Sequence, residues 1–236
     1  RTPELNTVSS AVTYSVKLSA EKTHALLGSV NEAYNTQIND MLISALVLSL
    51  AHWTGNSTVV IDLEGHGREE LFEDVDLSRT VGWFTSVFPI LLELPSNNQP
   101  ASVIKSIKEQ LRAIPNRGIG YGILRYLCED TSVKQKLQTI PTPEVSFIYL
   151  GQFDQVQSSI GWKFAPESTG ANQSLKQTRD HILNVNSLVV EGELQIDWTY
   201  SNSIHTHATV ENLAQSYLKA INTLLKHCQL EENTGY

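Results

Sequence analysis

Cysteine is scarce in this sequence, which has only Cys128 and Cys228 in 236 residues. A single pair so far apart does not make a disulfide framework, and two reduced thiols are the simpler interpretation. The chain also has no GxSxG, no GxxxxGK and no HExxH motif. We therefore expect neither a disulfide-stabilised secreted domain nor one of the hydrolases and nucleotide-binding enzymes that these motifs mark.

Positive charge and long apolar runs are lacking too. The chain has 17 basic against 25 acidic residues and a net charge of −8. An acidic surface argues against nucleic acid and anionic membranes as partners. No segment has the apolar length of a membrane span, and nothing resembles a signal peptide, so we expect a cytoplasmic protein. The chain starts at Arg1 rather than at Met, and we expect it to be a piece of a longer polypeptide.

The composition, with 41% hydrophobic and 18% charged residues, is that of a packed globular protein. Hydrophobic periodicity alternates between strand-like and helix-like segments, which predicts one layered α/β domain over residues 1–236. We expect strands at 13–18, 57–64, 83–94, 144–150, 159–165, 181–190 and 193–201, and helices at 20–34, 37–53, 99–114, a short one ending near 128, and 207–227.

Individual segments carry more specific signals. The segment 37–53 is apolar nearly all round, which predicts a helix buried on several sides and ended by Gly55. Pro89 inside a strand favours a sheet edge or a bulge. The aromatic pair Trp83 and Phe84 is expected in the core rather than in contact with a substrate.

One charged segment, Glu64–Glu70 (EGHGREE), has the features of a site. Its glutamate ends a predicted strand, where a rigid element would hold an acid or base at the mouth of a loop. The glycines that flank His66 allow a sharp turn and a close approach to the backbone. An ordinary charged loop, with Glu64 paired to Arg68 or Arg79, explains the same residues.

Metal ligands are not expected. His205 and His207 are two residues apart and would share a strand face, but no third ligand is near them in the sequence. We interpret them as two surface histidines before a helix.

An ordered series of motifs changes the interpretation of Glu64. The series resembles that of epimerization domains, which belong to the condensation-domain superfamily of nonribosomal peptide synthetases. Related condensation domains share the fold but lack the EGHGRE and RTVGWFT forms. The motifs are YNTQINDMLISA (34–45), EGHGREE (64–70), RTVGWFTSVFP (79–89), PNRGIGYG (115–122) and FIYLGQFD (147–154).

The resemblance implies a chloramphenicol-acetyltransferase-like lobe, a mixed β-sheet covered by helices, which forms one half of a V-shaped domain. The family's HHxxxDG motif belongs to the N-terminal half and is missing here, so we expect this chain to be the C-terminal lobe, with the N-terminal lobe of the same domain as partner. Ile148 stands where the family usually has Asn, which puts a polar role at this position in doubt.

The family inverts the α-carbon of an aminoacyl or peptidyl thioester that a peptidyl carrier domain holds on its phosphopantetheine arm. The resemblance therefore implies an isomerase of antibiotic and other secondary-metabolite synthesis, with no directly bound cofactor. Removing a weakly acidic α-proton needs a positioned base and a stabilised enolate. Inversion needs one proton-handling group on each face; the resemblance assigns one to Glu64 and the other to a histidine of the missing HHxxxDG motif.

Further roles follow from the resemblance. Tyr149 would orient the substrate or hydrogen-bond the enolate, although a buried tyrosine bonded to a backbone group fits equally. Arg79 would hold the loop by pairing with a carboxylate, and His66 would shape it. Gly120 and Tyr121 would line the path of the pantetheine arm or pack against the other lobe. We group His66, Arg79, Gly120 and Tyr121 as candidates for binding the substrate or its arm.

Two other functions fit the same fold. The lobe would belong to a condensation or other acyl-transfer domain that forms amides or esters, or it would be a non-catalytic lobe that docks a carrier domain. We expect the isolated chain to be inactive, because half of the acid/base pair is missing. A lobe separated from its partner is also expected to expose an apolar face and to self-associate.

Overall fold

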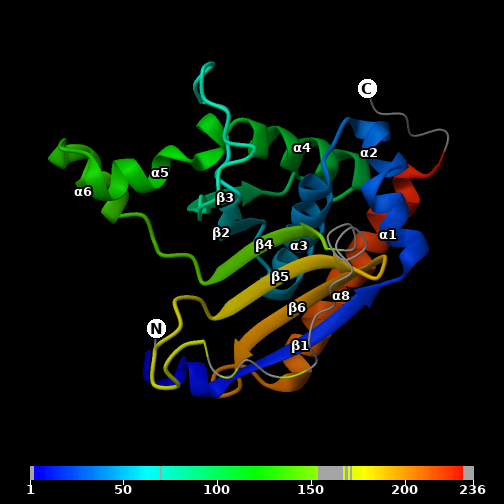
Figure 1. The fold of residues 1–236 in the computed structure, drawn as a ribbon. Helices are drawn as coiled ribbons and strands as arrows, with labels where there is room; N and C mark the ends of the chain where they lie inside the picture. Colours follow the sequence, from blue (N-terminus) through cyan, green and yellow to red (C-terminus); the bar gives the residue numbers. More distant parts are fainter. Residues whose placement is uncertain (1–2, 70, 154–166, 168–169, 171, 231–236) are drawn as a thin grey trace.

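The computed structural model describes residues 3–69, 71–153, 167, 170 and 172–230. These residues form a six-stranded sheet in the order β1-β6-β5-β4-β2-β3 (Figure 1). The pairs β2–β4 and β4–β5 are parallel and the others antiparallel, so the sheet is mixed as predicted. The strands are β1 (Ala11–Leu18), β2 (Thr58–Gly65), β3 (Ser86–Glu93), β4 (Val145–Gln152), β5 (Leu183–Val190) and β6 (Glu193–Ser201).

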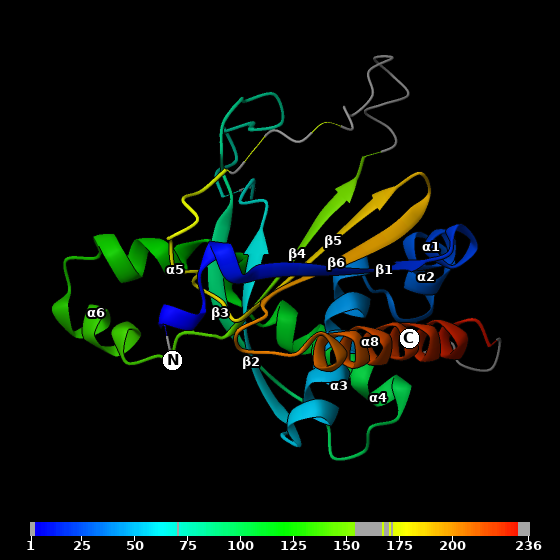
Figure 2. The same ribbon diagram turned by 90° about the horizontal axis from the view of Figure 1, so that it is seen from below.

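Helices cover one face of the sheet. Figure 2 shows α3, α4 and α8 together on one side of it, whereas α5 and α6 lie beyond its β3 edge. None of the helices formed by the described residues combines the length and hydrophobicity needed to cross a membrane. The helical elements are η1 (Pro3–Leu5), η2 (Val8–Ser10), α1 (Ala20–Leu27), α2 (Ser29–Tyr34), α3 (Ile38–Thr54), α4 (Pro100–Arg112), η3 (Pro115–Gly118), α5 (Gly120–Gly122), the π-helix η4 (Ile123–Leu127), α6 (Thr131–Gln138) and α8 (His207–Cys228).

Helix α3 is the centre of the core, as its all-round apolar sequence predicts. It packs against α4 and α8, and nearly all side chains from Asp40 to Ala51 are buried. Gly55 ends it in the left-handed conformation, with φ of 76°. On α8, Tyr217 is completely buried, and its hydroxyl donates a hydrogen bond to the Leu42 carbonyl at 3.2 Å. This bond ties the last helix to the middle of α3.

The hairpin of β5 and β6 forms as predicted, and its alternation separates two faces of the sheet. Leu194, Ile196, Trp198 and Tyr200 are buried against the helices. The opposite face, here called the open face, is polar at this end of the sheet. Its side chains pair across β1 and β6: Thr13 with Thr199 at 2.9 Å, Ser15 with Asp197 at 2.6 Å, and Lys17 with Glu193 at 3.3 Å.

Several boundaries differ from the sequence prediction. The helix expected over 20–34 is two helices, because Gly28 adopts φ −119° and ψ −108° between them. Strand β3 starts at Ser86 instead of 83, although Pro89 does lie in an edge strand as expected. Helix α6 was not predicted; the Asp130 side chain caps it by accepting bonds from the amides of Ser132 and Val133. The strand predicted over 159–165 lies outside the described residues.

Candidate functional site

Strand β2 carries its two carboxylates on the open face. Val59 and Ile61 are buried in the core, and the alternation of the strand turns Asp62 and Glu64 the other way. Glu64 is the last residue but one of β2, so it stands on a hydrogen-bonded strand just before the loop that leads to β3. This is the position that the sequence predicted for it.

The neighbours of Glu64 across the sheet are apolar. It pairs with Val87 on β3. On the other side of β2, the parallel pairing with β4 ends one residue earlier, where Leu63 lies beside the buried Phe147. The pKa of Glu64 is raised above its ordinary value by partial burial, and the nearby His181 opposes this rise through its charge. The fold thus favours proton retention by this carboxyl, as a proton-exchanging group requires.

Asp62 is held by an ion pair with His181, the residue that comes shortly before β5. The Asp62 Oδ2 atom lies 2.7 Å from His181 Nε2, and the side chains are only 13% and 15% exposed. The pair is therefore shielded from solvent on the same face as Glu64.

A cavity of about 350 Å³ lies around the end of β2. Leu63 and Glu64, which point to opposite faces of the strand, both line it. Its other walls come from the start of α3, the end of α4 and the turn after α4, including Asp40, Arg112 and Arg117. Burial raises the pKa of Asp40, although that carboxylate also accepts a hydrogen bond from the Gln37 amide at 2.8 Å.

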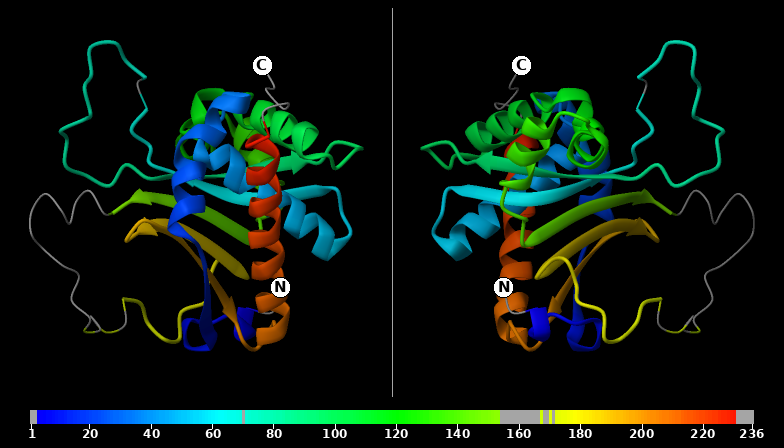
Figure 3. Two further views of the ribbon diagram at one scale, coloured as in Figure 1. Left: turned by 90° about the vertical axis from the view of Figure 1, so that its right-hand side faces the viewer. Right: turned by 90° about the vertical axis from the view of Figure 1, so that its left-hand side faces the viewer.

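The loop after β2 needs glycine at position 67. Gly67 has φ of 64°, in the left-handed region, and its backbone lies directly against Phe84. Next to it, the Arg68 guanidinium stacks on the Phe84 ring at 4.3 Å. Arg68 also donates hydrogen bonds to the carbonyls of Leu77 at 2.7 Å and Gly82 at 3.3 Å. Arg68 thus organises this long loop, which Figure 3 shows extending away from the helices.

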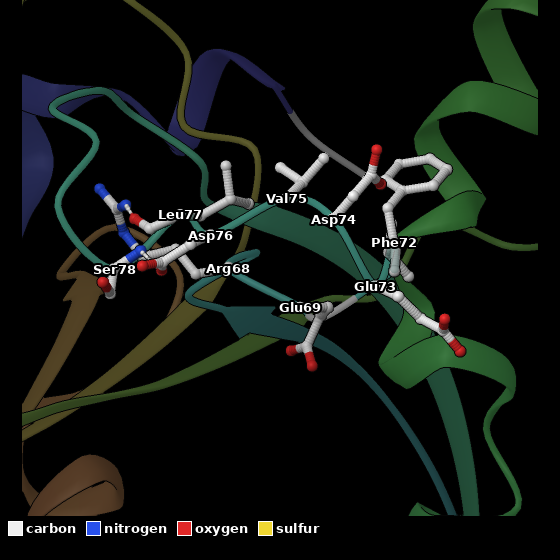
Figure 4. Close-up of a pocket in the computed structure, with 10 residues that line it drawn as sticks. Arg68, Glu69, Phe72, Glu73, Asp74, Val75, Asp76, Leu77 and Ser78 are labelled. Atoms are coloured by element: carbon white, nitrogen blue, oxygen red, sulfur yellow. Dashed lines mark hydrogen bonds between the residues drawn. The ribbon is translucent and has the colours of Figure 1, made fainter.

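A second hollow, of about 620 Å³, lies within the loop itself. Figure 4 shows the residues that line it, with Arg68 on one side and the acidic side chains of Glu73, Asp74 and Asp76 around it. Hydrogen bonds from Ser78 lower the pKa of Asp76. These contacts are local turn contacts, and they indicate how the loop keeps its shape.

Glu69 connects the loop to the turn after α4. Its carboxylate lies 3.6 Å from His66 Nε2 and 3.4 Å from Arg117 Nη1. His66 Nδ1 in turn accepts a hydrogen bond from the Arg68 amide at 2.9 Å, which agrees with a role in shaping the loop. Two motifs that lie far apart in the sequence are thereby joined next to the cavity.

Tyr149 lies on the other face of the sheet from Glu64. It pairs with the buried Ser187 of β5 and packs against the core, with its pKa raised by burial. Its hydroxyl finds no hydrogen-bond partner among the described residues, so the alternative of a backbone-bonded tyrosine is not observed there. A contact of Tyr149 with the reacting group stays a prediction, and the strand pleat separates it from Glu64.

Gly120 and Tyr121 lie in the short helix α5. Gly120 has open space where a Cβ atom would be, and Tyr121 packs partly against the core and bonds to Arg125 through its hydroxyl. The following residues Ile123, Tyr126 and Leu127 are exposed. Two interpretations of this region remain predictions: it lines the path of the pantetheine arm, or it packs against another lobe.

One expectation about the loop is corrected, and the pairing of Arg79 with a carboxylate stays a prediction. Trp83 is 88% exposed and is not in the core, because the loop does not fold back over the sheet. Arg79 is exposed and forms no ion pair with any residue that the structure describes, and Glu64 pairs with neither Arg68 nor Arg79 in that part of the chain. Arg68 makes loop-holding contacts of its own, with the carbonyls of Leu77 and Gly82 and with the Phe84 ring.

Sequence reasoning missed Asp62, His181 and Glu69. Glu69 is part of the quoted motif and could have been found as its second acidic residue. Asp62 lies within the predicted strand 57–64 but belongs to none of the quoted motifs. His181 carried no signal, because it lies 119 residues from its partner and outside every motif.

His205 and His207, just before and at the start of α8, have structural partners. The His205 ring packs edge-on against Trp53 at 5.5 Å, and His207 Nδ1 lies 3.2 Å from the Tyr200 hydroxyl. Among the described residues, no cluster of three or more His, Cys, Asp or Glu side chains is arranged to hold a metal ion.

Comparison with known proteins places this geometry in a family. The model of the Condensation domain family matches residues 2–235. The chain is 47% identical over 236 residues to one component of the linear gramicidin synthase of Brevibacillus parabrevis, a match that covers 99% of this chain and 3% of that protein. It is 38% identical over 228 residues to gramicidin S synthase 1 of Brevibacillus brevis, covering 93% of this chain and 21% of that protein. The chain thus spans a small part of these relatives.

Solved structures show the same fold. The epimerization domain from the third module of tyrocidine synthetase B superposes with a TM-score of 0.87 and 38% identity, over 96% of this chain and 50% of that chain. A condensation domain that acts in chain release from the enacyloxin polyketide synthase superposes with a TM-score of 0.64 and 14% identity, over 94% of this chain and 42% of that chain, and shows the fold alone. The mixed sheet and its helices are the predicted chloramphenicol-acetyltransferase-like fold, and the chain belongs to the condensation-domain family of nonribosomal peptide synthetases.

Proposed function

We propose that this chain is the C-terminal lobe of an epimerization domain. Together with an N-terminal lobe, it would convert the L- to the D-configuration at the α-carbon of an aminoacyl or peptidyl thioester. The observation that supports this most is the placement of Glu64, a partly buried carboxyl with a raised pKa at the end of a strand and beside a cavity. The likeness to a solved epimerization domain points the same way.

The chemistry asks for a group that can both take and give a proton near neutral pH. A carboxylate with an ordinary pKa is too weak a base for a thioester α-proton, and burial strengthens it. In the proposed step, Glu64 accepts the α-proton from one face while the electron pair of the C–H bond passes into the enolate. The second group then donates its proton to the opposite face, and solvent exchange restores both groups.

The second proton-handling group has to come from outside this chain. The HHxxxDG motif of the family is not in this sequence, so we assign the second group to a histidine of the N-terminal lobe. The thioester would arrive on the phosphopantetheine of a peptidyl carrier domain. Gly120, Tyr121, His66 and Arg79 remain candidates for contacts with the substrate or its arm.

A second candidate function keeps the fold and changes the reaction. The matching family is named for condensation, and acyl-transfer domains share this fold. Amide or ester formation would need an acceptor nucleophile, whereas epimerization would proceed on a single loaded carrier. The two functions therefore differ in a measurable way.

The test is α-proton exchange in the restored domain. The chain is joined to an N-terminal lobe that carries the HHxxxDG motif, and a carrier domain is loaded with an aminoacyl thioester. Solvent deuterium uptake and the D-product are then measured. We expect uptake with D-product formation, and a loss of at least about 100-fold with Glu64→Gln, the usual size of a general-base contribution.

Glu193→Gln is the matched control, since Glu193 is an exposed glutamate of the same open face paired with Lys17. It should leave the exchange rate unchanged. Absence of exchange in the intact domain, together with transfer to an added acceptor, would favour acyl transfer. Full exchange in the Glu64→Gln variant would make Glu64 a structural residue.

A further inference from the structure

The ion pair of Asp62 and His181 joins two distant parts of the chain on the open face. Asp62 lies on β2, whereas His181 lies just before β5, and β4 stands between these strands in the sheet. The 2.7 Å distance and the low exposure of both side chains describe a closed contact, not a loose surface pair. None of the sequence motifs includes His181.

Hydrogen bonds of Asn6 and Arg179 fix the backbone around His181. The Asn6 side-chain amide donates hydrogen bonds to the carbonyls of Arg179 and His181, each at 3.0 Å. Arg179 donates to Asn6 Oδ1 at 3.2 Å and to the Thr199 carbonyl at 2.9 Å. Asn6 is buried. The imidazole is therefore held in place by a network that includes the N-terminal segment and β6.

Asp62 and Glu64 are two residues apart on one face of β2, which separates their Cα atoms by about 7 Å. Two carboxylates that are partly buried so close together would disfavour each other's ionised form. When the His181 ring is protonated, its charge compensates that of Asp62, and the same positive charge lowers the pKa of Glu64 against the rise caused by burial.

We propose that His181, through its ion pair with Asp62, is a positioning residue for Glu64: it neutralises the neighbouring carboxylate, so that Glu64 is the group of this face that exchanges its proton. The effect on catalysis rests on the proposed function, but the coupling between His181 and Glu64 does not.

Other charged groups surround Glu64 and enter the same balance. They come from each element that meets the end of β2. Among the residues that the structure describes, His181 and Asp62 are the one shielded pair on the same face of the strand as Glu64. The others among the described residues are His66 and Glu69 in the loop, Asp40 of α3, Arg112 of α4, Arg117 of η3 and, next to His181, Arg179 and Asp180.

The coupling is tested by titration of Glu64 in the 236-residue chain. Glutamate labelled with ¹³C at the carboxyl carbon is followed by NMR, and the Glu64 signal is assigned from its absence in Glu64→Gln. The substitution His181→Gln keeps a hydrogen-bond donor but removes the charge. We expect it to raise the titration midpoint of Glu64 by about one pH unit, the usual effect of removing one nearby positive charge. Adding Asp62→Asn should move it part of the way back.

Asp197→Asn is the matched control, because Asp197 is a carboxylate of the open face that accepts a hydrogen bond from Ser15 and has no histidine partner among the described residues. It should leave the Glu64 midpoint in place. The unsubstituted chain gives a second measurement that does not depend on the folding of a variant: its Glu64 signal should show an additional inflection where the His181 ring titrates.

The outcomes separate the two proposals. An unchanged midpoint in His181→Gln and a single inflection in the unsubstituted chain would overturn the role of His181, whatever the reaction is. In the restored domain, the same variant should shift the pH profile of deuterium uptake upward by the same amount. A shift of the Glu64 midpoint in His181→Gln, with no epimerization by the restored domain, would support the coupling of His181 to Glu64 and contradict the proposed function.

Discussion

Gly67 lies against the backbone of Phe84, so closely that a Cβ atom at position 67 would be 1.6 Å from the Phe84 carbonyl oxygen. The same loop is held by Arg68, which stacks on the Phe84 ring. The glycine that follows His66 is therefore required by the loop geometry, and the position of Arg68 depends on it.

Gly67→Ala is expected to displace the loop and to reduce deuterium uptake in the restored domain at least tenfold. Gly55→Ala is the matched control, because Gly55 has a similar positive φ of 76° with nothing within 4 Å of its Cβ position. Both variants carry backbone strain of about 1–2 kcal/mol, but only the first has the clash. Equal activity of the two variants would contradict the argument. Faster proteolysis between residues 66 and 85 in Gly67→Ala alone would locate the effect.

The partly buried carboxyl of Glu64 makes the stability of the chain depend on pH. Burial raises the pKa of Glu64 in the folded chain above the value of about 4.3 expected when unfolded. Its contribution to stability is fully present below the unfolded pKa and is lost as the pH rises through the folded pKa. We expect Glu64→Gln to raise Tm at neutral pH and to change it little near pH 4. A lower Tm at neutral pH would mean that the ionised carboxylate stabilises the fold.

The elements that the sequence predicted well are those with a local pattern. Helix α3 is recognisable because it is apolar all round, and β6 because buried and polar residues alternate along it. The Gly28 break was missed because a single glycine inside a helical pattern is often tolerated. Trp83 was misplaced because hydrophobicity predicts burial only where a loop folds back onto the core, which no local pattern records.

In the candidate site, too, residues marked by a local pattern could be predicted and contacts between distant residues could not. Glu64 could be predicted, since its motif and its strand position are both local. The pair of Asp62 with His181 could not, because the contact depends on the parallel pairing of β2, β4 and β5 and joins residues 119 apart. Tyr149 follows from a motif, but the face on which it lies depends on the strand register.

The register yields a prediction for Tyr149. Since its side chain packs on the core face and not beside Glu64, Tyr149→Phe should keep the packing and lower the exchange rate by less than about tenfold, far less than Glu64→Gln. Tyr200→Phe, which removes the hydroxyl of another core-face tyrosine, is the control. A loss in Tyr149→Phe as large as that in Glu64→Gln would show that the hydroxyl acts on the reacting group.

The exposed apolar side chains predict how the chain behaves without a partner lobe. Val81 is 99% exposed and Trp83 88%, and Leu127 of η4 is 74% exposed. Apolar groups so exposed favour association, so we expect light scattering to show a molar mass that rises with concentration. Trp83→Ser combined with Leu127→Ser should reduce this rise, whereas Leu230→Ser, at an exposed leucine after α8, should not. Joining the N-terminal lobe should have the same effect as the double substitution, because the lobe would cover these side chains. A strict monomer at high concentration would show that these residues face solvent without attracting a partner, and the surface for the second lobe would then have to lie elsewhere.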